Sequence, residues 1–177
     1  GETGLVIGID FTETMIKKAV ENADKHGLKN VQFRFGDIEK MPVAANKADV
    51  VISNCVLNLV PDKQKAFSEI YRVLKNKGHF SISDVVLIGN LPENIAKAAE
   101  MYAGCVSGAM QKAEYLSIIE KTGFVNIQIQ KEKAITIPDE ILLKYLTKKE
   151  LTDFRKANTS IFSITLYAEK PDCNCER

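Results

Sequence analysis

Two short runs of the chain place a cysteine among small and polar residues. Residues 53–59 read Ser-Asn-Cys-Val-Leu-Asn-Leu, and residues 103–109 read Ala-Gly-Cys-Val-Ser-Gly-Ala. Thiolate sulfur is a soft ligand that favours soft, metal-like atoms. If Cys55 and Cys105 share one pocket, they suit a soft, thiol-seeking atom. The alternative is that each is a buried structural cysteine, which is a common place for a thiol.

Three further polar residues, Asp10, Asp37 and Asn54, each follow an apolar run that is typical of a strand. The carboxyl ends of parallel strands meet at one edge of an open α/β sheet, and that edge binds ligands. A carboxylate there can accept two hydrogen bonds from a ligand. Each residue also has a structural alternative, because Asp and Asn are common at helix N-caps and in turns.

The hydrophobic periodicity predicts alternating strands and helices, which is the pattern of a doubly wound α/β sheet. One helix is expected between a cap at Asp10 or Thr12 and a stop at Gly27. Strands are predicted at residues 5–9, 31–35, 49–53, 80–86, 124–130 and 161–168, and the other helices at about 62–74, 95–102, 113–121 and 139–156.

The chain has 177 residues, which suits one domain with its own core. Its net charge of +1 gives no electrostatic reason to expect nucleic acid or an anionic membrane as a partner. No apolar run approaches the roughly 20 residues of a membrane helix, and the first residues do not resemble a signal peptide. Four dispersed cysteines fit a reducing compartment, so a cytoplasmic location is predicted.

Five segments carry a family resemblance: residues 6–10 (Val-Ile-Gly-Ile-Asp), 36–42 (Gly-Asp-Ile-Glu-Lys-Met-Pro), 53–59, 82–86 (Ile-Ser-Asp-Val-Val) and 105–109. With the order of elements, they resemble the class I S-adenosylmethionine (SAM) methyltransferases. That resemblance implies a Rossmann-like sheet, mostly parallel with an antiparallel last strand. The two cysteine runs narrow it to the arsenite methyltransferases. Many relatives of other specificity carry histidine where this chain has Asn58.

The resemblance also assigns residues to the cofactor SAM. Asp10 would accept hydrogen bonds from the ribose hydroxyls, and Phe11 would pack on the adenine face. The Asp37 side chain would hold the adenine amino group while the backbone N–H of Ile38 reaches a ring nitrogen. Asn54 would line the site at the carboxyl edge of the central strand. For Phe11 the alternative is an ordinary core position.

For the substrate, the resemblance implies that Cys55 and Cys105 hold As(III), supplied as arsenite or a thiol conjugate. Arsenic bound by thiolates keeps a lone pair that can accept the methyl group of SAM, so the transfer needs no general base. Cys173 and Cys175, in the polar tail at residues 171–177, would capture arsenic or relay disulfides. A thiol reductant would restore the trivalent state.

Asp10 lies closer to the start of the chain than the pattern requires. In dinucleotide-like folds the acidic ribose ligand follows the glycine fingerprint by roughly 20 residues, whereas only nine residues precede Asp10. We therefore predict a single, partial methyltransferase domain over residues 1–177 that lacks the first strand and the glycine-rich loop. The resemblance places a further cysteine in that missing part.

Loss of a central strand would leave two strand edges unpaired. Such a chain is expected to recruit a strand from a neighbour as an oligomer, to re-pair its own strands, or to be marginally stable. A second departure is Asn76-Lys77-Gly78, where the family usually has Pro-Gly-Gly; Gly78 is expected to keep the flexible position of that turn.

Two other functions remain open from the sequence. One is a SAM-dependent methyltransferase that acts on a small organic molecule, with both cysteines incidental. The other is a truncated remnant without activity that binds arsenic through its thiols.

Overall fold

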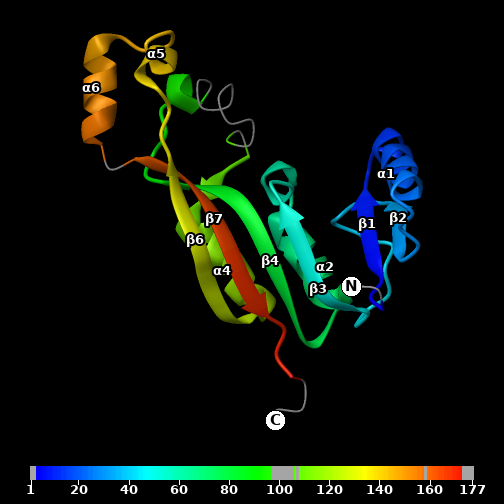
Figure 1. The fold of residues 1–177 in the computed structure, drawn as a ribbon. Helices are drawn as coiled ribbons and strands as arrows, with labels where there is room; N and C mark the ends of the chain where they lie inside the picture. Colours follow the sequence, from blue (N-terminus) through cyan, green and yellow to red (C-terminus); the bar gives the residue numbers. More distant parts are fainter. Residues whose placement is uncertain (1–2, 97–105, 107, 158, 173–177) are drawn as a thin grey trace.

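The computed structural model describes residues 3–96, 106, 108–157 and 159–172. Within them the strands form two sheets (Figure 1). A parallel pair consists of β1 (Val6–Asp10) and β2 (Val31–Phe35). The larger sheet has the order β3 (Ala48–Asn54), β4 (Leu74–Ile88), β7 (Ser160–Glu169) and β6 (Val125–Ile135), and the short β5 (Met110–Gln111) also pairs with β4.

The strand directions are those of the predicted fold. β3 and β5 run parallel to β4, whereas β7 is antiparallel to both β4 and β6. The helices α1 (Glu13–Lys25), α2 (Lys63–Val73) and α4 (Lys112–Thr122) alternate with the strands along the chain. The predicted α/β sheet with an antiparallel last strand is therefore confirmed. The described strands do not re-pair into one sheet, so the β1–β2 pair stays separate.

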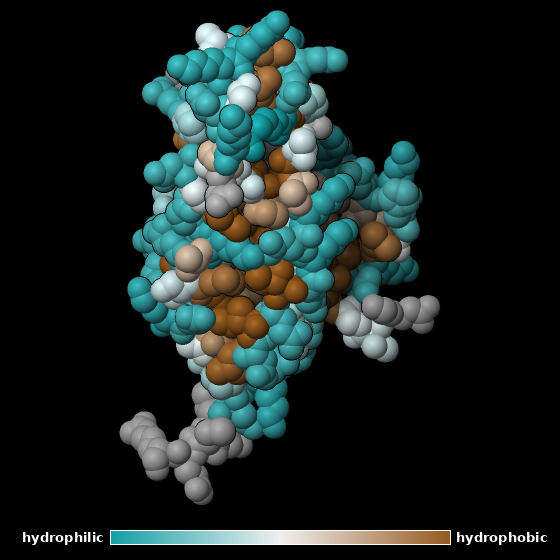
Figure 2. Space-filling view, turned by 90° about the vertical axis from the view of Figure 1, so that its left-hand side faces the viewer, coloured by the Kyte–Doolittle hydropathy of each residue, from teal (hydrophilic) through white to brown (hydrophobic). Residues whose placement is uncertain are grey.

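The main core lies between the larger sheet and the helices α2 and α4. Phe67 on α2, Phe80 on β4 and Tyr115 on α4 are fully buried there. The rings of Phe67 and Tyr115 meet edge to face at 5.5 Å, a favourable aromatic geometry. Viewed from the side of β6 and α6 (Lys148–Lys156), hydrophobic surface is confined to patches between hydrophilic side chains (Figure 2).

The single helix predicted over residues 139–156 is wrong. The structure has two helices there, α5 (Asp139–Leu142) and α6. Thr147 starts the second helix with a capping box, in which its hydroxyl accepts from the Glu150 N–H at 3.3 Å and the Glu150 carboxylate accepts from the Thr147 N–H at 2.7 Å. Of the helix predicted at residues 95–102, positions 97–102 lie outside the described residues.

The predicted turn Asn76-Lys77-Gly78 is instead part of β4, which begins at Leu74 rather than at residue 80. Lys77, not Gly78, adopts a positive φ of 64°. Gly78 is required for a different reason: a Cβ there would lie 2.8 Å from the Lys75 carbonyl oxygen and 3.0 Å from that of Asp49. A glycine is needed at position 78 because the backbone at Lys75 and Asp49 approaches it closely, not because the turn must be flexible.

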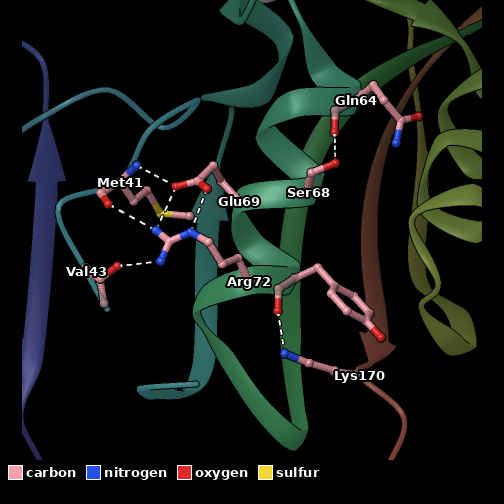
Figure 3. A network of polar contacts seen from close by, with 8 residues as sticks. Met41, Val43, Gln64, Ser68, Glu69, Arg72 and Lys170 are labelled. Atoms are coloured by element: carbon pink, nitrogen blue, oxygen red, sulfur yellow. Dashed lines mark hydrogen bonds and ion pairs between the residues drawn. The ribbon is translucent and has the colours of Figure 1, made fainter. Parts of the chain in front are cut away.

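The loop after β2 is fixed to α2 by one ion pair (Figure 3). The Arg72 guanidinium donates to both carboxylate oxygens of Glu69 at 2.6 and 2.8 Å, and to the carbonyl oxygens of Met41 and Val43 at 3.1 and 2.8 Å. Glu69 also accepts from the Met41 N–H at 2.8 Å. Charge-assisted bonds in such a fork are strong and directional. They hold the loop that follows β2 against α2.

Lys170 forms a second clamp, at the same C-terminal end of α2 as Arg72. Its ammonium donates to Asn46 Oδ1 and to the carbonyl oxygens of Tyr71 and Leu74 at 2.8–2.9 Å, and it lies 4.7 Å from the centre of the Tyr71 ring. The residue is 6% exposed. Removal of the ammonium would leave buried acceptors unsatisfied, so this remote clamp contributes to stability.

We predict that Glu69→Gln destabilises the chain near neutral pH by about 1–2 kcal/mol, because a charge-assisted fork is replaced by a weaker neutral one. The hydrogen bond from Arg72, followed by that from the Met41 N–H, lowers the pKa of Glu69 below 4.5. A lowered folded-state pKa stabilises above the unfolded value and loses that effect as pH falls. Urea titrations should therefore show the wild-type and variant free energies of unfolding converging below about pH 4. A constant difference down to pH 3 would contradict this.

Candidate functional site

The predicted acidic residues lie together at the carboxyl ends of β1 and β2. Asp10 and Phe35 are register partners, and the Gly36 N–H donates to the Asp10 carbonyl oxygen at 3.0 Å. Asp37 follows directly, and its Oδ1 accepts from the Glu39 N–H at 2.8 Å. The parallel pairing thus brings two carboxylates, 27 positions apart in the chain, to neighbouring strand ends.

Asp10 is not the N-cap of α1, because Thr12 holds that position. The Asp10 Oδ1 accepts from the Thr12 N–H at 2.7 Å, which orients the carboxylate and leaves Oδ2 as the oxygen that a ligand donor would meet. Phe11 is 75% exposed, so the alternative of an ordinary core position is wrong. An exposed aromatic face beside an oriented carboxylate suits a ligand with a flat ring and hydroxyl groups.

β3 ends at Asn54, and Cys55 follows it directly at the carboxyl end of the strand. Asn54 is exposed and Cys55 is half-buried. Cys55 adopts a left-handed backbone with φ of 55°, and its N–H donates to the Ser83 carbonyl oxygen at 2.8 Å. Outside glycine such a conformation costs on the order of 1–3 kcal/mol, and it is concentrated at functional sites. β4 holds this turn in place, because Asn54 is in register with Ser83 before it and the Asn58 side chain bonds to Val85 after it.

A buried acid that the sequence analysis did not single out lies behind this turn. Asp84 on β4 is 1% exposed and accepts from the Tyr115 hydroxyl at 2.6 Å. Burial is the largest influence on its pKa and raises it to about 6, although the Tyr115 hydroxyl, the Asn58 N–H and the charge of Lys63 favour the ionised form. The available sequence signal was an acid on the same alternating face of the strand as the apolar residues Phe80, Ile82 and Val86.

We predict that Asp84→Asn removes a pH-dependent part of the stability. The folded-state pKa lies above the unfolded value of 3.8, so the wild-type chain loses stability as pH rises from about 4 to 6, by about 3 kcal/mol in total. The asparagine variant cannot titrate and should lack this segment of the curve. Urea unfolding of both chains at steps from pH 4 to pH 7.5 measures the difference. Parallel curves would show that Asp84 titrates normally.

The other predicted thiols, Cys105, Cys173 and Cys175, lie outside the described residues. Within the described part, no group of three or more His, Cys, Asp and Glu residues is arranged to hold a metal ion. The structure brings Asp10 and Asp37 to neighbouring strand ends of one sheet, and it places Asn54 and Cys55 at the end of β3 in the other sheet. Likewise, none of the helices in the described ranges is both long and apolar enough to cross a membrane.

The fold and the position of this site define a class. The antiparallel β7 is inserted between β4 and β6, which is the strand order of class I methyltransferases. Polar residues at the strand ends are also typical of that class. In agreement, residues 1–123 match a family described as a methyltransferase domain. The chain belongs to this methyltransferase family.

Within the family, the resemblance to arsenite methyltransferases is confirmed. The chain is 37% identical over 171 residues to an arsenite methyltransferase of Halobacterium salinarum. The alignment covers 97% of this chain and 41% of that protein. It is 39% identical over 151 residues to the arsenite methyltransferase of Homo sapiens, covering 80% of this chain and 40% of the relative. The chain thus spans about two fifths of the length of these relatives.

A solved structure gives the same result. The crystal structure of an arsenic (III) S-adenosylmethionine methyltransferase from Chlamydomonas reinhardtii superposes with a TM-score of 0.77 at 30% identity. The match covers 99% of this chain and 58% of that one. The YcgJ protein of Bacillus, at 17% identity and a TM-score of 0.73, supports the fold alone.

Proposed function

We propose that the whole protein transfers a methyl group from SAM to thiol-bound As(III). The observation that carries the proposal is the strained turn at Cys55, which directly follows the carboxyl end of β3. A turn that holds a thiol at this strand end serves a substrate that binds through sulfur. The identity to arsenite methyltransferases supports the same substrate.

The residues at the ends of β1 and β2 fit the adenosine half of SAM. Asp10 has an oriented carboxylate for the ribose hydroxyls, and Phe11 has an exposed ring for the adenine face. The Asp37 carboxylate and the Ile38 N–H would bind the adenine edge, and Asn54 would border the site from β3. When bound, the cofactor supplies an electrophilic methyl group.

The contribution of the chain to the chemistry is to hold the substrate. Cys55 and Cys105 would bind As(III) as thiolates, which leaves the arsenic lone pair directed away from the sulfur atoms. Rate enhancement would come from holding donor and acceptor in near-attack geometry. Because both thiols must lose protons to bind, affinity for arsenic should weaken as pH falls.

Other features of the proposal concern redox chemistry. Cys173 and Cys175 would pass arsenic or disulfides between the site and a small thiol reductant. A reducing compartment such as the cytoplasm would keep these thiols available. We further propose that residues 1–177 belong to a single methyltransferase domain, of which they form a part, with residues 171–177 as a tail.

The thiol site is tested by native mass spectrometry of the reduced chain with arsenite. All variants are made in a background chain that carries Cys173→Ser and Cys175→Ser and therefore lacks the tail thiols. This background chain is the control. This chain is expected to bind one arsenic, and addition of Cys55→Ser or Cys105→Ser should reduce occupancy at least tenfold, since one thiolate holds As(III) far less tightly than two. Equal binding by the serine variants, or no binding by the folded background chain, would contradict the proposal.

Two of the outer strand edges, those of β1 and β3, support a proposal about association. Among described residues, β3 has its pairing partner on one side only and β1 pairs only with β2. The side chains nearby are apolar and exposed, at 57% for Val6, 47% for Val50 and 78% for Ile52. Exposed edges with apolar side chains are prone to pair with another strand. We propose that copies of this chain associate through these edges.

Light scattering after size exclusion tests the association. The mass of the wild-type chain should rise with concentration, whereas Ile52→Lys should remain closer to the monomer mass, because a buried ammonium opposes strand pairing. Ile129→Lys on β6, at the far edge of the larger sheet, is the matched control and should associate as the wild type does. A monomer at every concentration would overturn the proposal.

A further inference from the structure

Along the edge of β4 that faces away from β7, three different groups pair with the strand in succession. β3 pairs with β4 as far as Asn54 and Ser83, and β5 pairs with it from Val86. Between these ladders β4 presents Val85, whose backbone is buried. A buried N–H and C=O at that point require a partner. The structure provides it from a side chain, not from a strand.

That side chain is Asn58. Its amide nitrogen donates to the Val85 carbonyl oxygen at 2.7 Å, and its Oδ1 accepts from the Val85 N–H at 2.9 Å. Asn58 is 2% exposed, so both bonds are shielded from water. The amide therefore replaces one residue of a strand and bridges the interval between β3 and β5. Only a group that donates and accepts in one plane can do this.

The backbone of Asn58 is fixed as well. Its carbonyl oxygen accepts from the buried Lys63 ammonium at 3.2 Å, and the same ammonium donates to the Val60 carbonyl oxygen at 3.1 Å. Burial lowers the pKa of Lys63, which is consistent with an enclosed position. Side chain and main chain of Asn58 are thus held from two directions, and the short 3-10 helix at Leu57–Leu59 is fixed with them.

Asn58 also contacts the second cysteine-bearing run. A Cβ built on Gly108 would lie 1.7 Å from the Asn58 carbonyl oxygen and 2.7 Å from its carbonyl carbon. Only a glycine permits this approach, because the obstacle is backbone. Gly108 leads directly into β5. Asn58 follows Cys55 by three positions, and Gly108 follows Cys105 by three positions.

We infer that Asn58 is a positioning residue that joins the two cysteine-bearing runs on β4, with Gly108 as its counterpart in the second run. Asn58 fixes the first run by its hydrogen bonds to Val85. Its backbone carbonyl group packs against Gly108 of the second run so closely that only glycine fits there. The joint would set the spacing at which both thiols reach one arsenic atom. The inference rests on the proposed function but concerns residues that need not touch the substrate.

The test uses phenylarsine oxide, an organic As(III) reagent that bridges two thiols. It is added to the full chain in the Cys173→Ser, Cys175→Ser background. Asn58→Asp keeps the shape but loses the donor to Val85, and Gly108→Ala adds the obstructed methyl group. Each is expected to weaken binding at least tenfold. Alkylation of Cys55 by iodoacetamide, a one-thiol reagent, should not slow.

Lys170→Met is the control for general destabilisation. It removes a buried clamp at the far end of α2 and should lower the unfolding temperature while affinity for phenylarsine oxide stays within twofold of the background. If Asn58→Asp and Gly108→Ala also bind within twofold, the inference is wrong although the proposed function stands. If the background chain itself fails to bind through Cys55 and Cys105, the proposed function is wrong.

A pH series separates positioning from a general loss of structure. A protonated carboxyl group can donate and accept, so in the Asn58→Asp variant acid restores the missing donor to Val85. The ratio of its affinity for phenylarsine oxide to that of the background should therefore rise as pH falls from 8 to 5.5. Division by the background removes the common effect of thiol protonation. A ratio that stays flat or falls would contradict the inference.

Discussion

The hydrogen-bonding requirement of β4 is the constraint on which the rest of the structure depends. From Gly78 to Val86 the residues of this strand are buried or half-buried, so its backbone groups there must be paired on both edges. β7 satisfies one edge continuously, from His79 with Glu169 to Ile88 with Ser160. The other edge faces the site and is satisfied in pieces. Because β3 ends before β4 does, the chain can leave the sheet at Cys55 and return at β5.

The second requirement is that the β1–β2 pair be held beside the larger sheet without sharing a strand with it. The Arg72–Glu69 fork ties the loop after β2 to α2, and α2 packs on the larger sheet. The consequence is functional, because Asp10 and Asp37 lie on one sheet and Cys55 on the other. An ion pair on α2 therefore bears on the relation between the proposed cofactor residues and the proposed substrate residue.

Several features of the site oppose stability. Cys55 has a left-handed backbone, and Asp84 is an acid enclosed in the core. Unfavourable local conformations and buried charges are retained only where many surrounding contacts hold them in place, and they are concentrated at functional sites. Here the surroundings are the buried amide of Asn58, the ammonium of Lys63 and the aromatic packing of Tyr115. The Asn58 amide, the Lys63 ammonium and the Tyr115 hydroxyl are each hydrogen-bonded there, which offsets the cost of burying them.

The sequence by itself determined the order of strands and helices, the α/β class and the strand-end positions of Asp10, Asp37, Asn54 and Cys55. These depend on hydrophobic period and on end residues that are adjacent in the chain. It failed where a local start signal was overlooked, at Thr147 and Glu150. Only the tertiary structure decided that Asn58 completes the edge of β4 and that Gly108 meets its carbonyl group. Those contacts join segments 27 and 50 positions apart, and no local pattern encodes the hydrogen-bonding need of a distant strand.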